Sequence, residues 1–292
     1  MKPYIFIAIS LFLFNFCDAV TFSEALKNLK VLESYITQYK SEKKSSASLT
    51  HLIVSFIREG KYSDTTWSIA GGSFPKDLVS YVNAKDAEKS TTAMSCRTYG
   101  NIVLPTKEKI DFVHMFAVMN GIENSKSYSK GFSALVGWGG DSAQLVQDLK
   151  KYNGTLDELI AQASKLLGVK GQFGEGDLNS DLDAPVILNN KTDKNTFAEI
   201  IERYYNGDEW KSRVPKFVKL TFPNLKEKSE LRTTLFNRYK SDNYIQILEC
   251  KYGIRKGGSL LGCYSPKGVI AKYVNHQKAA VYALADYLKN KL

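Results

Sequence analysis

The sequence predicts a mainly α-helical, compact domain with a small β-hairpin near its C-terminus. Three observations support this fold class. Apolar residues recur every three or four positions along most of the 292-residue chain. Threonine–glutamate capping pairs precede several of these segments, and glycines follow them. One stretch only, residues 243–264, has the apolar runs and central glycines that are typical of a hairpin.

The expected helices follow from these signals in chain order. The first begins after Thr21, which pairs with Glu24 in a capping box, and continues to about Tyr39. The most apolar one begins at Pro105 and stops at Gly121. The other expected helices cover residues 49–60, 75–82, 141–152, 155–168, 195–207, 225–240 and 266–290.

The N-terminus has the order of a secretory signal peptide. Lys2 precedes an apolar run over residues 4–16, and Cys17-Asp18-Ala19 offers a cleavage site before Val20. The run is too short to span a membrane, and no later segment reaches that length without charge. We therefore expect residues 1–19 to be removed and the rest to be secreted or to lie in the secretory-pathway lumen, without a transmembrane segment.

Two further features agree with secretion. Asn153 and Asn190 each begin a glycosylation sequon, so we expect a glycoprotein. Cleavage removes Cys17, and Cys250 and Cys263, which flank the expected hairpin tip, are the natural disulfide pair. Cys96 is then an odd thiol, either a small buried residue or a nucleophile.

The net charge of +10 is unevenly distributed. Residues 20–210 hold 22 Lys and Arg against 24 Asp and Glu, whereas residues 211–292 hold 17 against 5. We therefore separate a helical domain (20–210) from a basic C-terminal region (211–292), which can also be part of the same domain. In a secreted protein the expected partners of the basic region are an anionic glycan, a wall polymer or an acidic lipid surface, and not nucleic acid.

Asp111 and His114 are the leading catalytic candidates. They lie three residues apart in the most apolar expected helix, where a carboxylate beside an imidazole needs a partner. Such a pair can orient the ring and set its pKa, as an acid–base couple requires. The alternative is structural: Asp111 occupies the first helical turn and His114 is a satisfied core residue.

A second candidate is the stretch Gly137-Trp138-Gly139-Gly140-Asp141. Trp138, Gly139 and Gly140 predict a substrate-binding wall on which a sugar stacks, with Asp141 as a further catalytic carboxylate. In the alternative interpretation, Asp141 is only the N-cap of the next helix.

Residues 171–185 are acidic and glycine-rich and fail the EF-hand pattern, because Leu182 stands at the glycine position. They predict either a solvated acidic loop or a helix start near Asp183. A carboxylate from this loop can still pair with Asp111 or Asp141. Histidines and cysteines form no zinc pattern, and no cofactor-binding motif is present. We therefore expect no metal and no cofactor.

Two functions are consistent with these features. The first is a secreted hydrolase of a glycan or cell-wall polymer, which uses the Asp111–His114 pair and holds an anionic polymer on its basic region. The second is a non-enzymatic secreted protein that binds surfaces or membranes, in defence or adhesion, through the basic region alone. Whether the chain is an enzyme depends on whether Asp111, His114 and Asp141 converge in one solvent-open cleft or His114 is sealed in a core without a cleft.

Overall fold

The fold is described by a computed structural model over residues 20–57, 75–88, 99–125, 136–167, 175–241 and 273–292, with Ile245, Glu249 and Ile254. Within these residues it contains eleven α-helices and one three-stranded sheet, so the predicted mainly α class is confirmed. The helices are α1 (Phe22–Lys43), α2 (Leu49–Ile57), α4 (Leu78–Glu88), α5 (Phe112–Ser125), α6 (Val136–Leu149), α7 (Leu156–Leu166), α8 (Glu175–Asn189), α9 (Phe197–Asn206), α10 (Arg213–Thr221), α11 (Leu231–Ser241) and α14 (Val274–Lys291).

Three helix starts with a threonine–glutamate capping signal lie where the sequence predicts them. Thr155 before α7 and Thr196 before α9 each form a complete capping box with the glutamate three residues later. The Thr21 hydroxyl accepts a hydrogen bond from the Glu24 N–H at the start of α1. These bonds satisfy backbone N–H groups that the first helical turn leaves without partners.

The sheet corrects one predicted helix. Strand β2 (Ile102–Val103) pairs in parallel with β1 (Val20–Thr21) and antiparallel with β3 (Lys109–Ile110). Residues 105–110, expected to begin a helix, instead form the turn and second strand of this short hairpin. The Lys107 N–H donates to the Leu104 carbonyl at 2.8 Å, and Lys107 has a φ of 71°. Pro105 suits such a turn as well as it suits a helix start, so the local signal was ambiguous.

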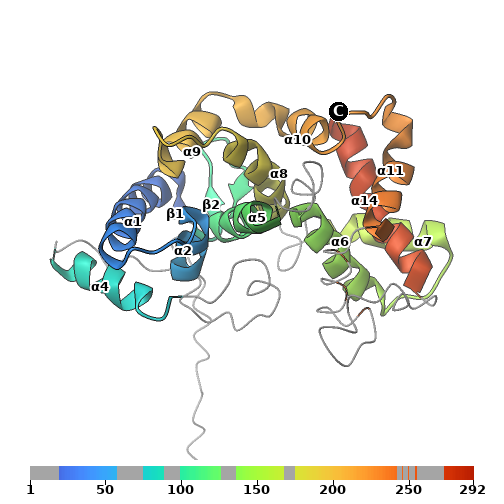
Figure 1. The fold of residues 1–292 in the computed structure, drawn as a ribbon. Coiled ribbons are helices and arrows are strands. Elements are labelled where there is room, and N and C mark those ends of the chain that lie inside the picture. The colour runs from blue at the N-terminus through green and yellow to red at the C-terminus, as the bar shows by residue number, and fades with distance from the viewer. Residues whose placement is uncertain are drawn as a thin grey trace, which may run out of the picture.

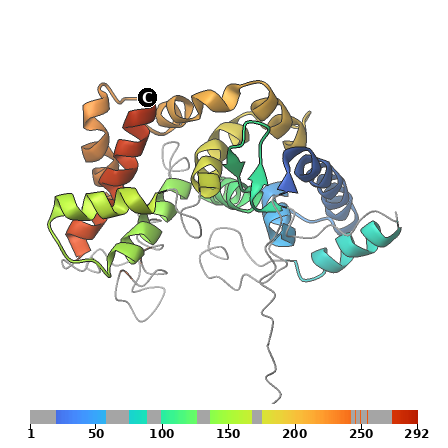
Figure 2. The same cartoon turned by 180° about the vertical axis from the view of Figure 1, so that it is seen from behind.

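The apolar side chains form two cores. The first core contains residues of α1, α2, α4, α5, the C-terminal part of α8, and α9. The second core contains residues of α6, α7, the N-terminal part of α8, α10, α11 and α14. Figures 1 and 2 show these two sets of helices as two lobes side by side.

Helix α8 belongs to both cores. Leu178 and Leu182 pack in the second core, whereas Ala184, Val186 and Ile187 pack in the first. Helix α5 contacts α8 from the first lobe and α6 contacts it from the second (Figure 1). The three helices α5, α6 and α8 therefore meet at the boundary between the lobes.

The basic C-terminal region shares its core with earlier residues. Val214, Phe217 and Leu235 pack in the second core beside Leu145 and Leu159. Helix α14, within the helix expected over 266–290, buries its alanines and leucines in the same core. The expected hairpin at 243–264 lies outside the described residues except at Ile245 and Glu249, which are helical, and Ile254.

Candidate functional site

His114, the third residue of α5, lies between two carboxylates of α8. Its Nδ1 is 3.6 Å from Oδ1 of Asp181, and its Nε2 is 3.8 Å from Oδ1 of Asp177. Asp177 and Asp181 are four residues apart and so share one face of the helix. The side chains of His114 and Asp177 are 35% and 23% exposed, whereas that of Asp181 is only 4% exposed. The ring therefore faces solvent on one side and a buried carboxylate on the other.

These carboxylates decide the charge of His114. Burial lowers the pKa of the imidazole, but Asp181, Asp177 and Asp111 together outweigh that effect and raise the pKa to about 9. At neutral pH the ring is therefore an imidazolium that both neighbouring carboxylates stabilise.

Asp141 approaches the same point from α6. It is 5% exposed, and burial followed by the Asp181 carboxylate raises its pKa well above the ordinary value. Its side chain is hydrogen-bonded to that of Asp181. No N–H or O–H of the described residues donates to Asp141 Oδ2 or Asp181 Oδ1, and the raised pKa of Asp141 favours its protonated form, whose O–H can donate to the Asp181 carboxylate. We call His114, Asp141, Asp177 and Asp181 the His114 cluster.

Asp111 has a different position from the one expected. It is the residue before α5, and its Oδ1 accepts hydrogen bonds from the N–H groups of Val113 and His114 at 2.6 and 3.1 Å. It caps the helix and acts on the ring only through its charge, whereas the ring nitrogens face Asp177 and Asp181. The expected Asp111–His114 side-chain pair is thus replaced by a pair between α5 and α8.

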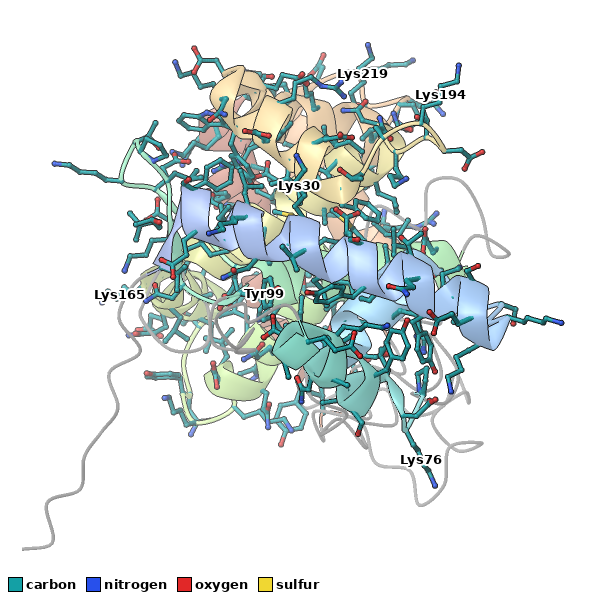
Figure 3. The ribbon with its side chains drawn as sticks, turned by 90° about the vertical axis from the view of Figure 1, so that its left-hand side faces the viewer. Lys30, Lys76, Tyr99, Lys165, Lys194 and Lys219 are labelled. Carbon is teal, nitrogen blue, oxygen red and sulfur yellow. The ribbon has the colours of Figure 1, made fainter. Side chains whose placement is uncertain are left out.

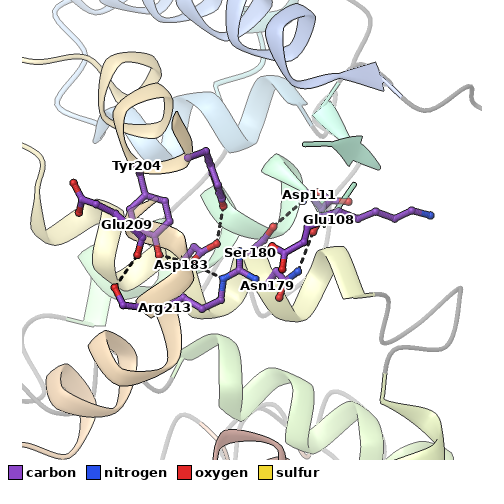
Figure 4. A network of polar contacts seen from close by, with 11 residues as sticks. Glu108, Asp111, Asn179, Ser180, Asp183, Tyr204, Glu209 and Arg213 are labelled. Atoms are coloured by element: carbon purple, nitrogen blue, oxygen red, sulfur yellow. Dashed lines mark hydrogen bonds and ion pairs between the residues drawn. The ribbon is translucent and has the colours of Figure 1, made fainter. Parts of the chain in front are cut away.

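Two hydrogen bonds fix the start of α5 against α8 (Figure 4). The Asp111 N–H donates to Ser180 Oγ at 2.7 Å, and Asn179 Nδ2 donates to the Lys109 carbonyl at 3.1 Å. Gly176 permits this close approach, because a Cβ there would lie 3.4 Å from the backbone of Ile110. The contact sets the position of His114 relative to Asp177 and Asp181.

The predicted stacking loop at Trp138, Gly139 and Gly140 is helical. Helix α6 begins at Val136, so Asp141 lies inside the helix and is not its N-cap. Gly139 has a packing role: a Cβ there would lie 2.8 Å from Cγ1 of Ile245. The side chain of Trp138 is outside the described part of the structure.

Asp177 and Asp181 are the site residues that sequence reasoning did not single out. Glycines, aspartates and Asn179 predicted a loop over 171–185, whereas α8 begins at Glu175. The missed signal is the pairing of Asp177 with Asp181 and of Leu178 with Leu182, each at a spacing of four. The sequence left open whether a carboxylate of this segment pairs with Asp111 or with Asp141. In the structure, Asp181 pairs with Asp141.

A second polar network joins α8 to α9 and α10. It buries the Arg213 side chain, so Arg213 does not contribute to the expected anion-binding surface. Arg213 Nε donates to Asp183 Oδ1 at 3.1 Å, and its Nη2 donates to Glu108 Oε2 at 3.1 Å (Figure 4). Tyr204 and Tyr205 donate their hydroxyls to the same Asp183 carboxylate, at 2.5 and 2.7 Å. Asp183 is fully buried, so this network is structural.

Among the described residues on and around α10 and α11, some basic side chains of region 211–292 form ion pairs and others are exposed. Lys211, Lys216 and Arg232 form ion pairs with Asp208, Glu209 and Asp286. Exposed lysines remain on and around α10 and α11, and Lys219 points away from the body of the protein (Figure 3). These exposed lysines are Lys219, Lys226, Lys228 and Lys240.

The structure bears only in part on the predicted glycosylation sites, cysteines, membrane span and metal site. Asn153 is exposed and Asn190 half-buried, so glycosylation of both stays a prediction. Residues 1–19, Cys96, Cys250 and Cys263 lie outside the described residues. Within the described ranges, no helix is long and apolar enough to span a membrane. The same part of the chain contains no group of three or more His, Cys, Asp or Glu side chains arranged to hold a metal ion.

Comparison with known proteins finds a family match for the part of the chain that contains the second core. The family model described as YkzU uncharacterised protein matches residues 116–291, more than half of the chain. The chain belongs to the YkzU family. The uncharacterized protein YkzU of Bacillus subtilis (strain 168) is 33% identical over 110 residues, which are 36% of this chain and 63% of that protein. The chain therefore matches less than two thirds of that relative's length.

The part matched by the YkzU family contains three of the four residues of the His114 cluster. Asp141, Asp177 and Asp181 lie within residues 116–291, and His114 lies two residues before the start of this match. No solved structure matches the chain.

Proposed function

We propose that the protein is a secreted hydrolase that cleaves a glycan or cell-wall polymer by acid–base catalysis at the His114 cluster. The supporting observation is that one imidazolium and three carboxyl groups from α5, α6 and α8 meet at the boundary between two cores. Substrate sites are common at such boundaries, and groups with strongly shifted pKa values are common at catalytic sites.

In this proposal the two partly exposed groups perform the chemistry. When the polymer binds, the 3.8 Å ion pair of His114 with Asp177 opens to admit the scissile bond and a water. Asp177 then accepts a proton from this water as the water oxygen bonds to the anomeric carbon. His114 donates its proton to the leaving oxygen as the glycosidic C–O bond breaks. Asp181 orients the His114 ring, and the proton shared with Asp141 lowers the negative charge next to the ring. Transfer of the proton from Asp177 back to His114 through solvent restores the site.

The exposed lysines around α10 and α11 support the second part of the proposal. Lys219, Lys226 and Lys228 are exposed, so an anionic segment of the polymer or an acidic lipid surface can contact them.

The test is the release of reducing ends from purified wall polymer by the full secreted chain. His114→Asn and Asp177→Asn are each expected to reduce the rate at least about 100-fold, the usual contribution of a general acid or base. Asp193→Asn, in the exposed loop between α8 and α9, is the matched control and should retain the wild-type rate. Full activity of either site variant, or no cleavage by the wild type, would contradict the proposal.

A non-enzymatic surface-binding protein is the second candidate, because the same exposed lysines can act without any reaction. Replacing Lys219, Lys226 and Lys228 by glutamate should abolish salt-sensitive binding to anionic vesicles. The control replaces Lys30, Lys76 and Lys194, which are exposed on the other lobe (Figure 3). Selective loss of binding, together with an inactive wild type, would favour this candidate over the hydrolase.

A further inference from the structure

Asp141 and Asp181 share an unusual deficit of hydrogen-bond donors. Both residues are more than nine-tenths buried, at 5% and 3% exposure. Neither Asp141 Oδ2 nor Asp181 Oδ1 receives a bond from an N–H or O–H group of the described residues. Within those residues, the one cation that forms an ion pair with either carboxylate is the His114 imidazolium, 3.6 Å from Asp181 Oδ1, and no lysine or arginine does so. Buried carboxylates normally have such partners, since burial without them is costly.

A shared proton meets only part of this deficit. One proton lets each of the two carboxyl groups hydrogen-bond to the other, but the pair keeps one negative charge. Asp111 adds a further carboxylate beside the same imidazole. The position between α6 and α8 therefore favours a cationic group that also brings several N–H donors.

The arrangement of the side-chain nitrogen and oxygen atoms favours an organic cation over a metal ion. The two ring nitrogens of His114 face different carboxylates, 3.6 and 3.8 Å away, and so do not point to a common centre with them. In the described residues, no three side chains converge as metal ligands do. A protonated primary amine carries three N–H donors, which Asp141 Oδ2 and Asp181 Oδ1 lack, and a second positive charge beside the single His114 imidazolium.

We propose that Asp141 and Asp181 bind a protonated amino group of the substrate, so that the substrate class is a glycan whose sugars carry free amino groups. This assignment rests on the proposed hydrolase function and names its substrate. On binding, the ammonium donates hydrogen bonds to Asp141 Oδ2 and Asp181 Oδ1, the shared proton leaves to solvent, and the ammonium charge then lowers the negative charge next to the ring in its place. His114 and Asp177, the more exposed members of the cluster, then lie on the solvent side, next to the sugar ring.

The experiment compares two oligosaccharides of equal length that differ only at nitrogen. The full secreted chain is titrated calorimetrically at pH 6.5 with a glucosamine tetramer and with its fully N-acetylated counterpart. We expect the glucosamine tetramer to bind at least about tenfold more tightly. Asp141→Asn and Asp181→Asn should remove this preference, since an amide carries no charge. Asp193→Asn should retain it, and thermal melts confirm that each variant is folded.

Equal affinity of the wild type for the two tetramers would overturn the assignment, without reference to any variant. A preference that persists in both Asn variants would also overturn it. A third arm uses Mg²⁺ and Ca²⁺ alone: binding that the same variants abolish, without amine preference, would assign the pair to an inorganic cation. Hydrolysis of both tetramers without preference would reject the substrate class and leave the hydrolase standing. Selective amine binding without any cleavage would reject the hydrolase instead.

Discussion

The imidazole Nδ1 of His114 lies 3.6 Å from Oδ1 of Asp181, so α5 of the first lobe and α8 meet through an ionisable pair. Asp141 joins the same carboxyl group from α6 of the second lobe. One buried carboxyl thus contacts residues of both lobes, and substitutions at this point are expected to change titration and stability together.

Asp181→Asn should lower the pKa of His114 from about 9 toward 6.5. The Asp181 carboxylate, 3.6 Å from the ring nitrogen, opposes the effect of burial on the ring through its close approach and its charge, and the amide keeps no charge. Titration of the histidine ring signals by NMR measures the change, with Asp193→Asn as the control. A His114 pKa that stays near 9 in the Asp181 variant would show that other groups hold the proton.

The contribution of His114 to stability should depend on pH. Its folded-state pKa of about 9 lies above the ordinary value of 6.5, so the folded state binds the proton more tightly. The stabilisation is therefore complete below about pH 6.5 and is lost as the pH rises through about 9. Urea unfolding of wild type and His114→Gln should differ most at pH 6 and least above pH 9. A difference that is constant over this range would contradict the linkage.

Glu33→Ala should destabilise the first lobe by about 2–3 kcal/mol, the usual cost of leaving buried N–H groups without partners. The Glu33 carboxylate of α1 accepts the N–H groups of Phe197 and Ala198 at 2.7 and 2.8 Å, at the start of α9. Glu33→Gln should cost less, because its amide oxygen still accepts. Urea unfolding measures both variants, and Glu24→Ala at an exposed position of α1 should change stability by less than about 0.5 kcal/mol. Equal losses in the Gln and Ala variants would argue against this capping role.

Arg213→Met should cost about 3–5 kcal/mol, because it leaves the fully buried Asp183 carboxylate without its cation. Asp183→Leu also removes the acceptor of the Tyr204 and Tyr205 hydroxyls. The double variant should cost at least about 1 kcal/mol less than the sum of the two single losses, since neither charge is then left alone. Chemical denaturation of all four proteins completes the cycle. Additive losses would mean that the two side chains do not act as a pair.

The sequence predicted the elements whose signals are local. Thr155 with Glu158 and Thr196 with Glu199 lie within one turn, so the capping bond and the helix form from the same few residues. The prediction failed where a local signal had two meanings. Pro105 fits a helix start and a turn equally, and the pairing of β2 with β1 and β3 decided in favour of the turn.

The candidate site was only partly predictable for the same reason. His114 and Asp141 stood out as polar residues in apolar or glycine-rich surroundings, and both belong to the His114 cluster. Asp177 and Asp181 did not stand out, because Gly176 and Asn179 have low helix propensity and predicted a loop. Contacts with Ile110, Lys109 and Asp111 hold that segment against the start of α5 in the folded protein.

The sequence by itself determined the helical class, the capped helix starts and the excess of basic residues after position 210, because each depends on residue types or on neighbours within a few positions. Only the tertiary structure decided which charges are available. Arg213 is neutralised in the interior by Asp183, whereas Asp141 and Asp181 meet with only the His114 imidazolium as a neighbouring cation. Charge and burial act through distances between helices, and residues far apart in the chain set those distances only once the two cores have packed.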